Sequence, residues 1–289
     1  MTGPLLTTAR AGKPMALAKR ALRATRRRWI RAFHSFSPQG LEIALRGLGI
    51  ADGDTVLLHS SFDAFEGFSG KPSDVLAVLS NILGSRGTLL VPTMPFTGTA
   101  VAYAGTDPIF DVLRTPSRMG LLTELFRRSP GVMRSLHPTH AVAASGARAV
   151  QMIQGHESAL TPCGVGSPYH KLLECNGRIL LLGTDISVLT FFHTLEELLE
   201  GELPVKPFTA ASFRLRTRAA DGSIVFTQTR LFEPAISRRR NIFKLVPYLR
   251  ASGFWRQAKA GKVDAVLLNA RDVLTAARNM LARGEFAYD

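Results

Sequence analysis

Short, fully apolar runs that each end in a polar loop constrain the fold of this chain more than any other feature. Residues 55–58 lead into a polar loop at 59–62, and residues 88–91 lead into another at 92–95. A third apolar run spans residues 178–182. Runs of this length without polar alternation are typical of strands buried on both faces. In an open α/β sheet, ligands bind beyond the carboxyl ends of such strands, so both loops are candidate binding loops.

Helical patterns separate these strands. Ser37 and Pro38 open a predicted helix that Gly49 ends, and apolar residues recur between them at three- and four-residue steps. Ser73 and Asp74 are read as the cap of the next helix. Further helices are predicted at 75–83, 121–128, 147–153 and 171–174. Residues 96–117 lack periodicity and are expected to wrap the surface.

The pattern changes after residue 202. Apolar and polar residues alternate over 213–218 and again over 223–229, on either side of an Asp221-Gly222 turn, which predicts an antiparallel hairpin. Two helices, at 236–259 and 270–283, are expected to flank a strand at 263–268. The predicted fold class is α/β with α+β mixing. It is a three-layer α/β/α open sheet with an inserted or appended antiparallel hairpin.

Positive charge is concentrated at the start of the chain. The 289 residues carry a net charge of +14, and the first 31 contribute +9 of it because they contain no acid. Residues 15–34 form a predicted amphipathic helix within a basic extension, 1–34, that precedes the main domain, 35–289. Such a helix can bind an anionic membrane surface or nucleic acid, or can pack on its own domain with its arginines in water.

Several classes of protein do not fit the sequence. No stretch reaches the ~20 apolar residues that span a bilayer, and no secretory signal is apparent. Cys163 and Cys175 are too few for a disulfide framework, so a reducing compartment and a cytoplasmic location are expected. The phosphate-binding patterns of dinucleotide and NTP folds are missing from the sequence.

Two segments hold the residues best suited to acid–base chemistry. His137 lies in the segment 134–140, whereas His193 and Glu196 share one helix face in the segment 190–197. An imidazole with a nearby carboxylate is suited to general-base catalysis. A metal site formed by His137, His140, His193 and Glu197 is an alternative. Paired cysteines and an H-E-x-x-H pattern are missing, so no metal is expected.

Over residues 37–270 the chain resembles the aminoglycoside 3-N-acetyltransferase family. The resemblance rests on an ordered set of motifs: Val56-Leu57-Leu58-His59-Ser60-Ser61, Gly87-Thr88-Leu89-Leu90, Arg118-Met119-Gly120, Arg134-Ser135-Leu136-His137-Pro138-Thr139-His140, Gly166-Ser167-Pro168 with Lys171-Leu172, Leu180-Leu181-Leu182-Gly183, and Thr190 to Glu196. The resemblance implies acetyl-CoA as the acyl donor, an amine as the acceptor and direct transfer in a ternary complex.

The same resemblance implies roles for individual residues. His137 is expected to be the general base and Glu196 to orient it, with His193 as the next candidate base. Thr190 is the candidate for stabilising the oxyanion. The acceptor side is expected to include His140, Gly166 and Ser167.

The CoA-binding half, residues 35–130, is expected to hold the donor, and the half 131–289 the catalytic and acceptor groups. The residues expected to bind CoA are His59, Ser60, Ser61, Phe62, Thr93, Arg118, Met119 and Gly120. Arg118 suits a CoA phosphate because a guanidinium at a helix start favours anions.

The acceptor stays open between an aminoglycoside and an amino sugar. Aminoglycosides are polycations, yet few acids lie near these motifs. Two other functions are also considered: a non-catalytic adaptor for membranes or nucleic acid acting through residues 15–34, and a metal-dependent hydrolase. For the enzyme we expect small-molecule partners, namely CoA and the amine, and no nucleic acid. We also expect a homodimer, and peripheral contact of residues 15–34 with an anionic surface.

Overall fold

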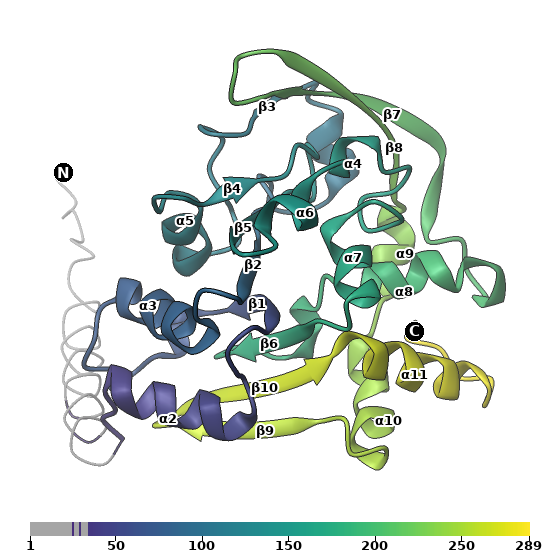
Figure 1. Cartoon of the computed structure of the whole chain (residues 1–289). Coiled ribbons are helices and arrows are strands. Elements are labelled where there is room, and N and C mark those ends of the chain that lie inside the picture. The colour runs from purple at the N-terminus through teal and green to yellow at the C-terminus, as the bar shows by residue number, and fades with distance from the viewer. Residues whose placement is uncertain (1–24, 26–28, 30–33) are drawn as a thin grey trace, which may run out of the picture.

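Seven strands form the central sheet of the computed structural model, which describes residues 25, 29 and 34–289 (Figure 1). In spatial order they are β4 (Met133–Arg134), β5 (Val142–Gly146), β2 (Thr88–Pro92), β1 (Thr55–Ser60), β6 (Arg178–Leu182), β10 (Val263–Asn269) and β9 (Arg256–Ala260). β1 pairs in parallel with β2 and with β6, whereas the other four strands are antiparallel to their neighbours. The carboxyl ends of β1, β2 and β6 therefore lie at one edge of the sheet.

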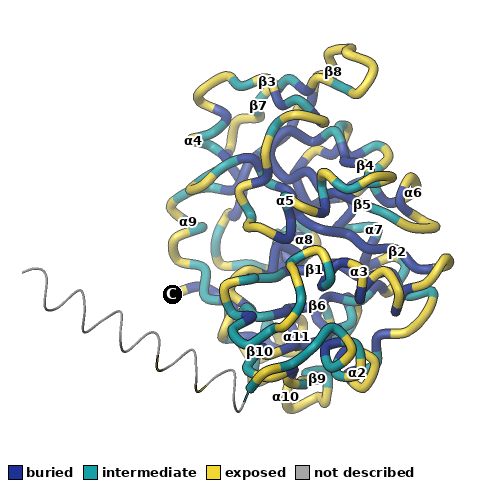
Figure 2. The backbone as a smooth tube through the Cα atoms, turned by 90° about the vertical axis from the view of Figure 1, so that its left-hand side faces the viewer, coloured by how far each residue is buried: buried dark blue, intermediate teal, exposed yellow. Residues whose placement is uncertain are grey.

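Helices cover both faces of this sheet, which confirms the three-layer prediction. Val56 and Leu58 of β1 pack in the core cluster shared with α2 (Pro38–Leu48), α3 (Pro72–Leu83) and α5 (Leu121–Arg127). Leu57 points to the opposite face because side chains alternate along a strand. That face is covered by α6 (Ala149–Ile153), α7 (Pro168–Glu174), α8 (Phe192–Leu198), α10 (Val246–Ala251) and α11 (Ala270–Leu281). The central strands are the deeply buried part of the backbone in Figure 2.

The predicted antiparallel hairpin is confirmed as β7 (Phe208–Arg218) and β8 (Ile224–Phe232), at the top of Figure 1. The Ser223 amide and hydroxyl both donate to Asp221 at the turn, at 3.0 and 2.7 Å. A third strand, β3 (Ile109–Asp111), runs parallel to β7. α4 (Ala100–Ala104) packs against Leu215 and Leu231 of the hairpin. Residues 96–117 thus contain a helix and a strand that their lack of periodicity did not predict.

One predicted helix was wrong. Residues 236–259 form α9 (Pro234–Arg239), a 3-10 turn (Ile242–Leu245), α10 and then the strand β9. Gly253 has a φ of +71°, and the Phe254 amide donates back to the Leu249 carbonyl at 2.8 Å, which closes α10. Pairing with β10 then makes a strand of the polar residues that follow.

The start of α2 agrees with the prediction from the sequence, whereas the start of α3 differs from it. The Ser37 hydroxyl accepts the Gly40 amide at 3.2 Å, and Gly49 ends α2 with a φ of +104°, as predicted. α3 begins earlier than expected, at Pro72, because the Asp74 carboxylate accepts the Lys71 amide at 2.7 Å.

Most of the predicted basic helix, 15–34, lies outside the described residues. Within the part that is described, the Lys262 ammonium lies 4.4 Å from the ring centroid of Trp29. None of the helices formed by residues 25, 29 and 34–289 is long and apolar enough to span a bilayer.

Candidate active site

A cavity of about 410 Å³ lies beyond the carboxyl end of β2. Met94, from the loop after β2, and Met119, from the loop before α5, form part of its wall. The Arg118 amide donates to the Met94 carbonyl at 2.8 Å and holds these two loops together. The cavity is also lined by His140, His193, Phe232 and Arg240, so it gathers side chains from segments far apart in the sequence.

His193 and Glu196 form a hydrogen-bonded pair at the wall of this cavity. His193 Nδ1 lies 2.6 Å from Glu196 Oε2, and both residues are on α8 at positions i and i+3. The His193 side chain is 16% exposed, whereas that of Glu196 is 1% exposed. The imidazole stacks on Phe232 with the ring centroids 3.9 Å apart. Since Glu196 engages Nδ1, Nε2 is the nitrogen that remains for exchanging a proton with a ligand.

The environment favours a neutral imidazole next to an ionised carboxylate. Burial and then the charge of Arg240 lower the pKa of His193, while Glu196 opposes both. Burial alone would raise the pKa of Glu196, but the hydrogen bond from His193 and the charge of Arg240 lower it overall. The pair can therefore accept a proton at neutral pH and hold it as an imidazolium.

Two further side chains bind the Glu196 carboxylate. Arg240 donates from Nε to Oε1 at 2.9 Å and from Nη2 to Oε2 at 3.1 Å. The Tyr288 hydroxyl donates to Oε1. Sequence reasoning missed both residues. Arg240 fell within a predicted helix, and nothing in the local pattern around Tyr288 indicates a contact with residue 196.

The predicted pairing of Glu196 with His137 was wrong. His137 is fully buried and does not line the cavity, and its Nδ1 accepts the amides of Thr139 and His140 at 3.3 Å. Its ring stacks on His156 with centroids 4.6 Å apart. Burial, followed by the charges of His156 and His140, puts the pKa of His137 well below its ordinary value.

The rest of the segment 134–140 holds loops in place. Arg134 donates from Nε to the Thr93 hydroxyl at 2.8 Å and from Nη1 to the Thr115 carbonyl at 2.6 Å. The Ser135 hydroxyl bonds Nδ1 of His156 at 2.8 Å. Buried cations and histidines with backbone partners fix the loops that border the cavity. His140 is the residue of this segment that lines it, with its ring perpendicular to that of His193 and 6.0 Å away.

The predicted loop 59–62 begins inside β1, whose last two residues each hold a buried polar atom that has no partner among the described residues. These are Nε2 of His59 and the hydroxyl of Ser60. Burial lowers the pKa of His59 to about 4. Ser61 donates its amide to the Leu182 carbonyl at 3.1 Å, and the Phe62 ring stacks on Phe65. None of these residues lines the 410 Å³ cavity; of the eight residues expected to bind CoA, Met119 does.

Three other predicted site residues have local backbone roles. The Ser167 hydroxyl accepts the His170 amide at 3.1 Å and caps α7. Gly166 precedes it with a φ of +88°. The Thr190 hydroxyl lies 3.5 Å from the Val188 carbonyl. None of the three lines the cavity.

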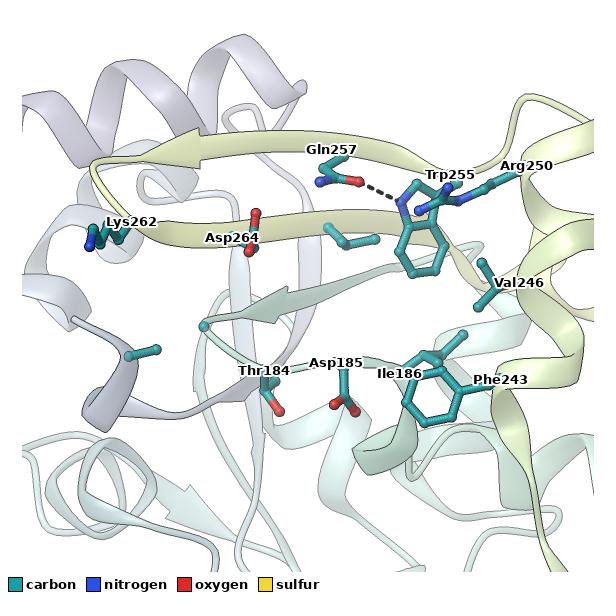
Figure 3. A pocket seen from close by; sticks show the side chains of 13 residues that line it. Thr184, Asp185, Ile186, Phe243, Val246, Arg250, Trp255, Gln257, Lys262 and Asp264 are labelled. Atoms are coloured by element: carbon teal, nitrogen blue, oxygen red, sulfur yellow. Dashed lines mark hydrogen bonds between the residues drawn. The ribbon is translucent and has the colours of Figure 1, made fainter. Parts of the chain in front are cut away.

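A second cavity, of about 440 Å³, lies along the β9–β10 hairpin (Figure 3). Trp255 and Phe243 stand at one end, Lys262 at the other, and Asp185 and Asp264 lie between them. It contains none of the predicted site residues. In the described part of the chain, no three His, Cys, Asp or Glu side chains are grouped so as to hold a metal ion.

Comparison with known proteins identifies a matching family. A family model described as aminoglycoside 3-N-acetyltransferase matches residues 57–282. Aminoglycoside N(3)-acetyltransferase VII of Streptomyces paromomycinus is 31% identical over 253 residues, which cover 80% of this chain and 86% of that protein.

Solved structures have the same fold. Aminoglycoside acetyltransferase AAC(3)-Xa superposes with a TM-score of 0.75 at 25% identity, over 92% of this chain and 99% of its own. A mutant of AAC(3)-IVa in complex with apramycin gives a TM-score of 0.67 at 26% identity, over 86% and 93% of the two chains. Sequence and fold together show that the chain belongs to the aminoglycoside 3-N-acetyltransferase family of acyltransferases.

Proposed function

We propose that the protein transfers an acetyl group from acetyl-CoA to an amine of an aminoglycoside or amino sugar, by direct attack in a ternary complex. The observation that carries the proposal is the His193–Glu196 pair, 2.6 Å apart, at the wall of a cavity that the loop after β2 also borders. Family membership supports the donor and the reaction class.

His193 is the general base in this proposal, in place of His137. An alkyl ammonium cannot attack a thioester until it loses a proton, and Nε2 of a neutral His193 can accept that proton. The amine nitrogen then bonds to the thioester carbon, the carbon–sulfur bond breaks, and the imidazolium gives its proton to the departing CoA thiolate. The nitrogen releases its remaining extra proton to water, so that the products are the neutral amide, the CoA thiol and one proton. Glu196 keeps the ring in one tautomer and stabilises the imidazolium.

The donor is proposed to lie along the loops after β1 and β2. His59 and Ser60 offer buried polar atoms that lack partners among the described residues, and the amides of pantetheine can supply them. Arg118 is exposed next to the Met94 loop, where its guanidinium suits a CoA phosphate. His140, which lines the cavity, stays the proposed acceptor contact. The expected oxyanion role of Thr190 finds no support, because its hydroxyl lies against the Val188 carbonyl and outside the cavity lining.

The test measures free thiol released from acetyl-CoA with a panel of aminoglycosides and amino sugars. His193→Ala is expected to lower kcat by about a hundredfold or more, the usual contribution of a general base. His137→Ala, if folded by circular dichroism, is expected to retain turnover, because His137 lies outside the cavity. Near-normal turnover in His193→Ala would contradict the proposal, as would release that does not depend on any amine.

A further inference from the structure

We propose that Tyr288 and Arg240 are positioning residues, which fix the Glu196 carboxylate so that it holds His193 in its reactive orientation. The inference rests on the proposed function of His193. Tyr288 lies beyond the residues that match the family model, 57–282.

The contacts on Glu196 leave its carboxylate little freedom. It accepts two hydrogen bonds from Arg240 and one from Tyr288, besides its bond to His193. A carboxylate that is 1% exposed needs such donors, because an unpaired buried charge is costly. With Oε1 engaged by both Tyr288 and Arg240, Oε2 is directed towards Nδ1 of His193.

The backbone contact between residues 239–241 and 287–289 brings both Arg240 and Tyr288 to the Glu196 carboxylate. Arg240 and Tyr288 are antiparallel bridge partners. The Asn241 amide donates to the Ala287 carbonyl, and the Asp289 amide donates to the Arg239 carbonyl, both at 2.8 Å.

Side chains reinforce this docking. The Lys244 ammonium lies 2.6 Å from the Tyr288 carbonyl and 2.6 Å from an Asp289 carboxylate oxygen. Residues 287–289 are therefore docked along 239–244, and this docking brings the Tyr288 hydroxyl to Glu196.

The charges around His193 and Glu196 determine in which direction the pKa of His193 should move when a neighbouring side chain is replaced. The groups that interact with His193 and Glu196 are Arg240 and Tyr288, His140 across the cavity, and the buried Cys163 thiol. Arg240 lowers the pKa of His193. Loss of its charge should make His193 more basic, and loss of the Tyr288 hydroxyl should do so less, because Glu196 then binds the imidazolium more strongly.

The experiment compares pH–rate profiles of kcat/KM for Arg240→Gln, Tyr288→Phe and Tyr248→Phe, with melting temperature and CoA-induced thermal shift measured for each. We expect Tyr288→Phe to lower kcat by about tenfold, the usual effect of losing a hydrogen bond to a charged group. The acid limb of the pH–rate profile of Tyr288→Phe should move to higher pH, because His193 becomes more basic. The acid limb of Arg240→Gln should move further in the same direction. Tyr248→Phe, which alters a mostly buried tyrosine on α10, should match the wild type.

Unchanged acid limbs in both Tyr288→Phe and Arg240→Gln would overturn the inference, as would a rate loss equal to that of Tyr248→Phe. If Arg240→Gln does not fold, Arg240→Lys takes its place and should keep the limb close to the wild-type position while Tyr288→Phe shifts it. His193→Ala separates the two proposals. If that variant is inactive and the limbs do not move, the positioning role fails alone. If it is active, the proposed function fails as well.

Discussion

Four buried histidines make the folded protein sensitive to acid. Burial is the main cause that lowers the pKa of each, to about 4 for His59, to about 3 for His156, and well below the ordinary value for His137 and His140. An unfolded chain binds protons at these rings below about pH 6.5, but the folded protein does not until lower pH. These rings therefore leave the free energy of unfolding unchanged above pH 6.5. Below pH 6.5 they lower it, and the loss continues until the pH reaches the low pKa values of the folded protein.

Urea unfolding at pH 7.5 and pH 5.5 tests this expectation. The free energy of unfolding should fall by about 1.4 kcal/mol per pH unit for each histidine once the pH is well below 6.5. The variant His156→Gln should reduce the slope by about one histidine's share. Equal free energies at the two pH values would contradict the effect.

The residues of the site differ in how well the sequence could predict them. His193 and Glu196 share a helix face by local geometry alone, so their proximity could be read from a three-residue spacing. Arg240 and Tyr288 reach Glu196 across 44 and 92 residues. Such contacts arise from tertiary packing, and no local pattern encodes them. The expected pairing of His137 with Glu196 also depended on tertiary packing, and the structure pairs Glu196 with His193 instead.

At the scale of elements, burial decided which strands could be predicted. β1, β2 and β6 lie in the interior of the sheet and read as apolar runs. β9 is an edge strand of mostly polar residues, Arg-Gln-Ala-Lys-Ala, and becomes a strand because it pairs with β10. Periodicity alone cannot detect a strand of that kind.

The cap of α2 offers a test at this scale. Ser37→Ala removes the hydroxyl that accepts the Gly40 amide and should lower the free energy of unfolding by about 1 kcal/mol. Turnover should not change, because α2 packs on the face of the sheet opposite α8. Ser37→Thr should restore most of the stability. An alanine variant as stable as the wild type in urea would show that the cap contributes nothing.

At the scale of the whole molecule, the described residues that line the cavity and support Glu196 belong to the segment 35–289. We therefore expect a truncated protein that begins at Ser35 to retain acetyl-CoA turnover. It should lose any binding to anionic vesicles, because the removed residues carry +9 of the net charge of +14. Vesicle sedimentation and thiol release measure the two properties. A folded truncation without turnover would show that the extension contributes to the active site.

The docking of residues 287–289 also sets an order of assembly. Every strand of both sheets lies before residue 270, so the sheets can pair before residues 287–289 dock along 239–244. At that stage Arg240 can bind Glu196, but Tyr288 cannot. A protein with both sheets complete can thus still lack one donor to Glu196, and catalytic competence should follow the docking of residues 287–289.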